Sequence, residues 1–289
     1  MNTDTLQRFL LADLDILGTV VRLGPAWRQM LDQRHYPSPV MRLLGELTAT
    51  TLLLSGKLKQ SGRMTIQLRG DGPVSLLVVD CDEQLRIRGM ARCATKPASG
   101  TTPELLGDGQ LLLALNLPSL REPYQSLVPL VGASVAAIFE HFLSQSEQLS
   151  SRFFLAASAE GVGGLLLQKL PAADERDADG WARMTALAAT VDASELLSLP
   201  AEHLLGRLFA EEKVRLFEPR RVVHHCPEDW PKVRSLLRAL GAAEAYAALQ
   251  EQGVIVIKDE ICNREYRFDT QAIDELFGKS SAAGTPTVH

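Results

Sequence analysis

Residues 64–79, MTIQLRGDGPVSLLVV, decide the fold class. Residues 64–69 alternate strictly between apolar and polar side chains, which indicates a β-strand with one buried face. Residues 70–73, Gly-Asp-Gly-Pro, predict a turn, and residues 74–79 predict a second strand. The stretch is therefore a β-hairpin, and we expect it to belong to an antiparallel sheet. A phosphate-binding loop is not favoured, because Gly70 and Gly72 lead into a strand and not into a helix.

Further strands and helices are predicted on both sides of this hairpin. A helix over residues 40–56 follows the stop and start signals Pro37-Ser38-Pro39, and a second helix is expected over residues 132–143. Strands are predicted as follows: residues 4–9 and 20–24, in the manner of strands at a sheet edge, then 85–89, 110–115, 152–157 and 164–170. Together these elements predict an α+β domain.

A change in composition at residues 171–180 marks a domain boundary, because this stretch is acidic and contains Pro and Gly. We predict an N-terminal α+β domain over residues 1–173 and a helical linker over 174–221. A small C-terminal domain of zinc-binding type over 222–277 and a disordered tail over 278–289 complete the chain. The linker helices carry an apolar stripe that must cover the N-terminal sheet, a partner subunit or an unfolded client.

Composition narrows the classes of protein to consider. With 289 residues the chain suits two domains, and its formal charge of −5 does not favour nucleic acid as a partner. The N-terminus has no secretory signal pattern, and the four cysteines form no disulfide framework, so we expect a cytoplasmic protein. The apolar stretch 40–58 is interrupted by Arg42, Glu46 and Lys57, which favours a buried helix over a membrane span.

Two short clusters near the C-terminus have the spacing of a metal site. His224 and Cys226 form an H-x-C pair, and Asp259 and Cys262 form a D-x-x-C pair after a long connection. Each pair can direct two donor atoms at one ion, and the connection can fold back to bring the pairs together. Imidazole, thiolate and carboxylate are all zinc ligands. The pattern predicts a zinc site made of His224, Cys226, Asp259 and Cys262.

Several motifs in order resemble the redox-regulated 33-kDa heat-shock chaperone family. They are the Leu-Leu-Gly-Glu helix at 43–46, the Gly-Asp-Gly-Pro turn at 70–73, and Cys262 followed by Tyr266, Phe268 and Asp269. The resemblance implies an ATP-independent holdase that binds unfolding client proteins under oxidative or heat stress, with no catalytic residues and with a homodimer as one form. It also implies that the linker covers an apolar sheet surface and unfolds on activation.

This chain departs from the family at the metal site, where members carry C-x-C and C-x-x-C. His224 and Asp259 occupy two of the four cysteine positions, so the two local disulfides of the family's oxidative switch cannot form here. Cys226 and Cys262 could instead join in one long-range disulfide, which would cross-link the folded domain and oppose its unfolding. Alternatively, they could stop at sulfenic acid or pair between subunits. We therefore expect client binding by the reduced protein, or activation by heat or acid.

Two other functions remain open. One is a constitutive chaperone or binding protein of the same fold, without metal and without redox control. The other is a zinc hydrolase in which His225 and either Glu228 or Glu260 would act as general acid and base. We favour it less, because a metal site formed where a small domain folds back on itself is usually structural and fully coordinated. Cys81 and Cys93 are expected to be structural thiols.

We predict that the reduced protein binds about one zinc ion through His224, Cys226, Asp259 and Cys262. Metal analysis of protein purified in reductant with zinc present measures the stoichiometry. The Cys226→Ser variant is expected to lose the metal, and a Cys93→Ser variant is the matched control. Metal-free wild-type protein from such a preparation would contradict the prediction.

Overall fold

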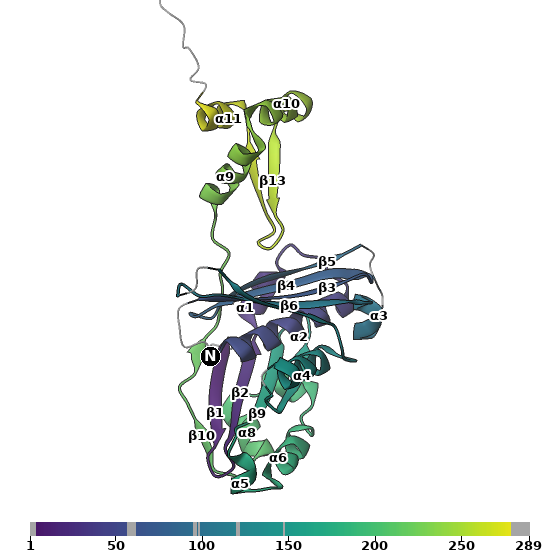
Figure 1. Cartoon of the computed structure of the whole chain (residues 1–289), viewed down its shortest axis with the longest axis vertical. Helices are drawn as coiled ribbons and strands as arrows, with labels where there is room; N and C mark the ends of the chain where they lie inside the picture. Colours follow the sequence, from purple (N-terminus) through teal and green to yellow (C-terminus); the bar gives the residue numbers. More distant parts are fainter. Residues whose placement is uncertain are drawn as a thin grey trace, which may run out of the picture. The chain divides into compact units, whose positions relative to one another are not determined.

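The protein consists of two compact units in a computed structural model that describes residues 4–56, 62–94, 97, 99–119, 122–146 and 148–278 (Figure 1). The N-terminal unit is Met1–His225 and the C-terminal unit is Cys226–His289. The domain boundaries after residues 173 and 221 stay predictions. Lys57 and all of the predicted tail except Gly278 lie outside the described residues. Within the described ranges, no helix is both long and apolar enough to cross a membrane.

The first sheet of the N-terminal unit has the strand order β10-β1-β2-β9-β8, with β11 also paired to β1. Every pairing in it is antiparallel. The bounds are β1 Thr5–Leu11, β2 Ile16–Leu23, β8 Ser151–Ala157, β9 Val162–Lys169, β10 Val214–Leu216 and β11 Arg220–Arg221. The expectation that the first two strands lie at a sheet edge is wrong, because β9 and β10 return from distant parts of the chain to cover them.

The second sheet has the strand order β12-β5-β4-β3-β6-β7. Its bounds are β3 Arg63–Gly70, β4 Val74–Asp82, β5 Arg86–Cys93, β6 Gly109–Asn116, β7 Tyr124–Pro129 and β12 Val223–His224. The predicted hairpin is confirmed as β3 and β4, whose antiparallel register pairs Met64 with Cys81. Only β12 pairs in parallel, with β5.

The Gly-Asp-Gly turn between β3 and β4 packs against the backbone that follows the short helix α3 (Thr102–Leu106). The Gly72 N–H donates to the Leu106 carbonyl at 2.9 Å, and the Asp71 N–H donates to Asp108 at 3.1 Å. A Cβ atom on Gly70 would lie 1.9 Å from the Leu106 carbonyl oxygen, so only glycine fits there. The glycines serve close backbone packing, as the interpretation as a turn predicts.

Helix α2 (Ser38–Ser55) lies between the two sheets and is buried on nearly all sides. In Figure 1 it runs between β3 and β6 above and the strands β2 and β9 below. A helix in this position must be apolar all round, and Leu43, Leu47 and Leu53 are completely buried. Three threonines inside α2 satisfy their hydroxyl groups by donating to the carbonyl four residues earlier; they are Thr48, Thr50 and Thr51.

The other helices of the N-terminal unit lie in two places: the first two pack into the core around α2, and the last three pack on the outer face of the first sheet. They are α1 Pro25–Leu31, α4 Val135–Ser146, α5 Ala173–Arg176, α6 Gly180–Ala188, α7 Ala193–Ser198 and α8 Ala201–Leu208. Helices α6, α7 and α8 bury their apolar stripe against β1, β2 and β9, where Met184, Leu196 and Leu204 join Phe9 and Leu165 in one cluster. Of the surfaces that the stripe could cover, the structure places it on the N-terminal sheet.

The C-terminal unit is a β-hairpin packed with three helices. Its elements are α9 Trp230–Leu240, α10 Ala242–Gln252, β13 Ile255–Asp259, β14 Arg264–Phe268 and α11 Thr270–Phe277. Val233, Leu237, Tyr266 and Ile273 are buried in its own small core. Helices α9 and α10 meet at Gly241, and the α+β fold class predicted for the whole chain is confirmed. The sequence did not predict α11.

Replacing Gly163 by Ala is expected to push α7 off the first sheet, because the new Cβ atom would lie 2.2 Å from the Leu196 carbonyl oxygen. Main chain cannot move aside unless the helix moves with it. We expect faster hydrogen exchange across residues 180–208 and unchanged protection of β3 and β4.

The matched control is Gly206→Ala in α8, where nothing lies within 4 Å of the added atom. This variant is expected to be neutral or more stable by up to about 1 kcal/mol. Equal exchange rates in the two variants would show that α7 does not depend on Gly163.

Candidate functional site

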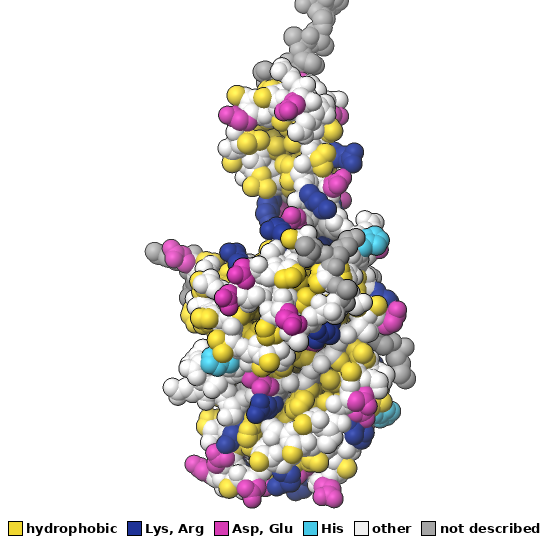
Figure 2. All heavy atoms as spheres, turned by 90° about the vertical axis from the view of Figure 1, so that its right-hand side faces the viewer, with side chains coloured by type: hydrophobic (Ala, Val, Ile, Leu, Met, Phe, Trp, Pro, Cys, Tyr) yellow, Lys and Arg dark blue, Asp and Glu magenta, His cyan; other side chains and the backbone are white. Residues whose placement is uncertain are grey.

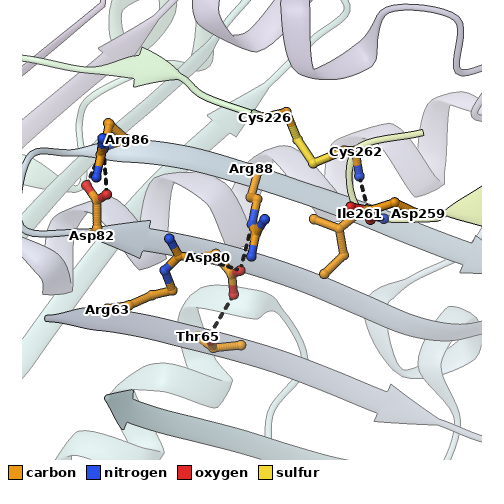
Figure 3. A network of polar contacts seen from close by, with 10 residues as sticks. All are labelled: Arg63, Thr65, Asp80, Asp82, Arg86, Arg88, Cys226, Asp259, Ile261 and Cys262. Atoms are coloured by element: carbon orange, nitrogen blue, oxygen red, sulfur yellow. Dashed lines mark hydrogen bonds and ion pairs between the residues drawn. A yellow bond between two sulfur atoms is a disulfide. The ribbon is translucent and has the colours of Figure 1, made fainter. Parts of the chain in front are cut away.

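Cys226 and Cys262 are joined by a disulfide within the C-terminal unit (Figure 3). Cys226 precedes α9, and Cys262 lies in the turn between β13 and β14. Their Cα atoms are 5.6 Å apart, although the residues are separated by 36 positions in the sequence. Of the routes left open by the sequence, the structure therefore contains the long-range disulfide.

Asp259 ends β13 and shapes the turn that holds Cys262. Its Oδ1 atom accepts hydrogen bonds from the backbone N–H groups of Ile261 at 3.0 Å and Cys262 at 3.2 Å (Figure 3). An aspartate that binds the N–H groups two and three residues later stabilises a tight turn. Asn263 then adopts a left-handed backbone with φ of 50°, which asparagine tolerates well. The carboxylate that the sequence assigned to a metal thus has a turn-forming role here.

The other half of the disulfide is held by β14. The Arg264 Nη2 atom donates to the Cys226 carbonyl oxygen at 3.1 Å. Three residues after Cys226, the Asp229 N–H donates to the hydroxyl of Tyr266, which is buried, at 2.9 Å. Trp230 packs edge-on against the Tyr266 ring, with centroids 4.9 Å apart. Arg264 and Tyr266 were not predicted as site residues, and their alternation along a strand was the signal that both reach the same neighbour.

His224 belongs to the N-terminal unit. It lies in β12, opposite Ile87 of β5, and the next residue, His225, donates its N–H to the Ile87 carbonyl at 3.0 Å. Burial lowers the pKa of His224, and electrostatic repulsion from Arg34 and from the neighbouring His225 ring lowers it further, so the neutral imidazole is favoured.

The donor set as arranged in this structure does not fit zinc. Sulfur atoms in a disulfide are not thiolates, and the thiolate is the form that binds a metal. Among the residues that the structure describes, no three His, Cys, Asp or Glu side chains gather closely enough to hold a metal ion. Coordination by His224, Cys226, Asp259 and Cys262 stays a prediction for the reduced chain.

The residues required for the alternative zinc hydrolase have structural contacts. The Glu228 carboxylate accepts a hydrogen bond from Trp230 Nε1 at 2.8 Å and lies 3.9 Å from the Arg264 guanidinium. These contacts fix the start of α9. Nothing in this arrangement favours Glu228 as a catalytic base.

Two cysteines outside this site are unpaired. Cys81 is completely buried in β4, and burial raises the pKa of its thiol to about 12. Cys93, at the end of β5, is half-buried. The buried position of Cys81 agrees with a structural role.

Two mainly antiparallel sheets around one buried helix, followed by a small unit closed by a disulfide, make up this chain, and the family to which it is similar is a family of chaperones. The chain belongs to the Hsp33 family, because the family described as "Hsp33 protein" matches residues 4–269. A 33 kDa chaperonin of Nitrosococcus oceani is 38% identical over 289 residues, covering 100% of this chain and 99% of that protein. A 33 kDa chaperonin of Pseudomonas aeruginosa PAO1 is 38% identical, with 98% and 97% covered.

A solved structure has the same fold. The crystal structure of a 33 kDa chaperonin (heat shock protein 33 homolog) from Thermotoga maritima aligns with a TM-score of 0.83, covering 96% of this chain and 99% of that one. Sequence identity is 20%, so this likeness concerns the fold alone.

Thiol titration of the oxidised protein is expected to follow burial. Of the four cysteines, two are in the disulfide, so native protein should show one reactive thiol, Cys93, at pH 8. Unfolding without reductant should release Cys81 as a second thiol, and reduction should release all four. Mass spectrometry of alkylated peptides assigns each one. Rapid alkylation of Cys81 in the folded protein would contradict its burial.

Proposed function

We propose that this Hsp33-family chaperone is an ATP-independent holdase, which binds unfolding proteins and prevents their aggregation. The observation that carries the proposal is the apolar stripe of α6, α7 and α8 on the first sheet. Undocking of these helices uncovers apolar side chains of the sheet and of the helices together, which is the kind of surface that an unfolded chain can bind. Action by binding and not by catalysis, and a cytoplasmic location, are parts of the same proposal.

Surface charge supports proteins and not nucleic acids as partners. The net charge is −5, and on the face drawn in Figure 2 charged side chains of both signs are scattered among hydrophobic ones. A nucleic-acid-binding surface would gather positive charge into a patch. Unfolded polypeptides, which present apolar side chains of every shape, suit a mixed surface of this kind.

The disulfide sets the direction of the proposed redox response. It constrains a loop of 36 positions, which stabilises the C-terminal unit by roughly 4 kcal/mol through the entropy of the unfolded chain. A single small core contributes only about 3–5 kcal/mol, so reduction without bound metal leaves the C-terminal unit marginally stable. Oxidation therefore closes this unit, and we propose that the reduced or heated protein is the more active holdase.

A constitutive chaperone without redox control is the second candidate. The observation in its favour is that neither Cys226 nor Cys262 has a cysteine one or two residues away. Because neither cysteine has such a neighbour, the two local disulfides that the family resemblance implies cannot form. The two candidates differ in whether oxidation changes client binding.

Light scattering of a chemically unfolded enzyme, diluted into buffer with the chaperone, tests the proposal. We expect the reduced protein to suppress aggregation at a lower concentration than the oxidised protein does. The Cys262→Ser variant is expected to behave like reduced wild-type protein with or without peroxide, whereas Cys93→Ser keeps the response. A reduced protein that is inert at every temperature but strongly active after peroxide would contradict the proposal that reduction increases holdase activity. Equal activity in both states would favour the constitutive candidate.

A further inference from the structure

Strand β7 forms one end of the second sheet, and no strand among the described residues pairs with its outer side. An open sheet edge presents backbone N–H and C=O groups that can bind another extended chain. Proteins usually block such edges with charged side chains, above all lysine. The chemistry of β7 therefore decides whether this edge is blocked or available.

Within the part of the chain that the structure describes, each of the other open edges carries positive charge on its strand or on the strand beside it. Arginine or lysine occurs in β8, β10, β11 and the hairpin strands β13 and β14: Arg152, Arg215, Arg220, Arg221, Lys258, Arg264 and Arg267. At the far end of the second sheet, β12 is only two residues long and β5 beside it carries Arg86, Arg88 and Arg92, of which Arg86 and Arg88 pair with Asp82 and Asp80 (Figure 3). In contrast, β7 reads Tyr-Gln-Ser-Leu-Val-Pro and has no side chain charged at neutral pH.

Three large apolar side chains on β7 and just beyond it are unusually exposed. Tyr124 is 55% exposed and Leu127 is 56% exposed, and Val131 just beyond the strand is 47% exposed. Leu127 lies opposite Leu112 of β6, so an apolar cross-strand pair borders the edge. Large apolar side chains on an uncharged edge cost solubility, and they suit a partner strand that is itself uncharged and apolar.

The hydrogen-bond register identifies which backbone groups face outward. Leu130 donates its N–H to the Gly109 carbonyl at 2.9 Å and continues the register in which Pro129 lies opposite Gln110. In an antiparallel pair the bonded positions alternate, so Val128, Ser126 and Tyr124 bond to β6. The N–H and C=O groups of Gln125 and Leu127 therefore point to the open edge.

Prolines limit this edge on both sides. Pro129 occupies the next outward-facing position and has no N–H, and Pro123 immediately precedes the strand. Proline at the margins of an open edge prevents long-range pairing and sheet growth. The edge that remains accepts a short extended segment through Gln125 and Leu127 and does not template a continuous sheet.

We propose that the open edge of β7 binds an extended, uncharged, apolar segment of an unfolded client protein as an added strand. Hydrogen bonds from Gln125 and Leu127 to the client main chain make the contact independent of client sequence, and the exposed side chains of Tyr124 and Leu127 select for apolar segments. This inference rests on the proposed holdase function and names a surface for it that is separate from the sheet face beneath α6, α7 and α8.

The test uses the full chain and a matched pair of variants. Gln125→Pro removes an outward N–H without disturbing a hydrogen bond to β6, whereas Gln125→Ala changes the same side chain and keeps the N–H. The probe is a short fluorescein-labelled peptide of alternating Val and Thr, and its counterpart with every backbone amide N-methylated is the control ligand. Loss of one hydrogen bond is expected to weaken binding about fivefold in Gln125→Pro and to leave Gln125→Ala unchanged. The N-methylated peptide is expected to bind neither the wild-type protein nor either variant.

A second pair tests the side-chain contribution. Leu127→Lys places a charge on the edge, and Leu236→Lys makes the same change on α9 at a residue that is 53% exposed. Only Leu127→Lys is expected to reduce both peptide binding and suppression of client aggregation. Circular dichroism and thermal unfolding check that all four variants are folded.

The outcomes separate this inference from the function on which it rests. Wild-type protein that suppresses aggregation, together with a Gln125→Pro variant equal to it in both assays, would overturn the β7 site and leave the holdase function intact. Wild-type protein that fails to suppress aggregation but binds the peptide through Gln125 would overturn the holdase function and support the β7 edge as a peptide-binding site. Conversion of a wild-type dimer to a monomer by Gln125→Pro, with peptide binding unchanged, would assign the edge to a second copy of the chain and overturn the proposal.

Discussion

The burial of α2 between two antiparallel sheets is the constraint on which the N-terminal unit depends. A helix with apolar side chains on every face is insoluble by itself, and each sheet exposes an apolar face without it. Removing a completely buried leucine such as Leu47 would cost about 2–5 kcal/mol, a large part of the stability of a typical domain. The interior threonines are compatible with this burial because their hydroxyls bond within the helix.

The N-terminal unit has two further apolar surfaces besides the core around α2: the outer face of the first sheet and the edge of the second sheet at β7. The outer face of the first sheet is covered by α6, α7 and α8, which form an apolar cluster separate from the core around α2. The edge at β7 is not covered within the described residues, and it is limited by prolines instead of charge. A holdase must expose apolar groups and still avoid assembling with itself. In the proposed function, covering by α6, α7 and α8 would meet that demand at the sheet face, and the flanking prolines would meet it at β7.

The C-terminal unit depends on a different constraint. Its core is small, and the bond between Cys226 and Cys262 ties the start of α9 to the hairpin turn. Asp259 and Arg264 hold the two ends of that bond by backbone hydrogen bonds, so both residues stabilise the geometry in which the sulfurs meet. A zinc-bound form would need the thiols free and Asp259 turned toward the ion. The reduced and oxidised chains are therefore expected to differ in the local structure of this turn.

Local pattern determined much of this protein. Strict alternation predicted the β3 strand and its hairpin, and helical periodicity predicted α2. The predicted zinc site included Cys226 and Cys262, which the structure joins in a disulfide, and coordination by all four residues stays a prediction. Pairing between distant segments came only from tertiary structure, since β9 and β10 enclose β1 and β2. Strand β7 was missed because its alternation is weak and its partner is β6 alone. Periodicity reports which face of an element is buried, whereas the choice of neighbour depends on packing and loop closure across the whole chain, which no local pattern contains.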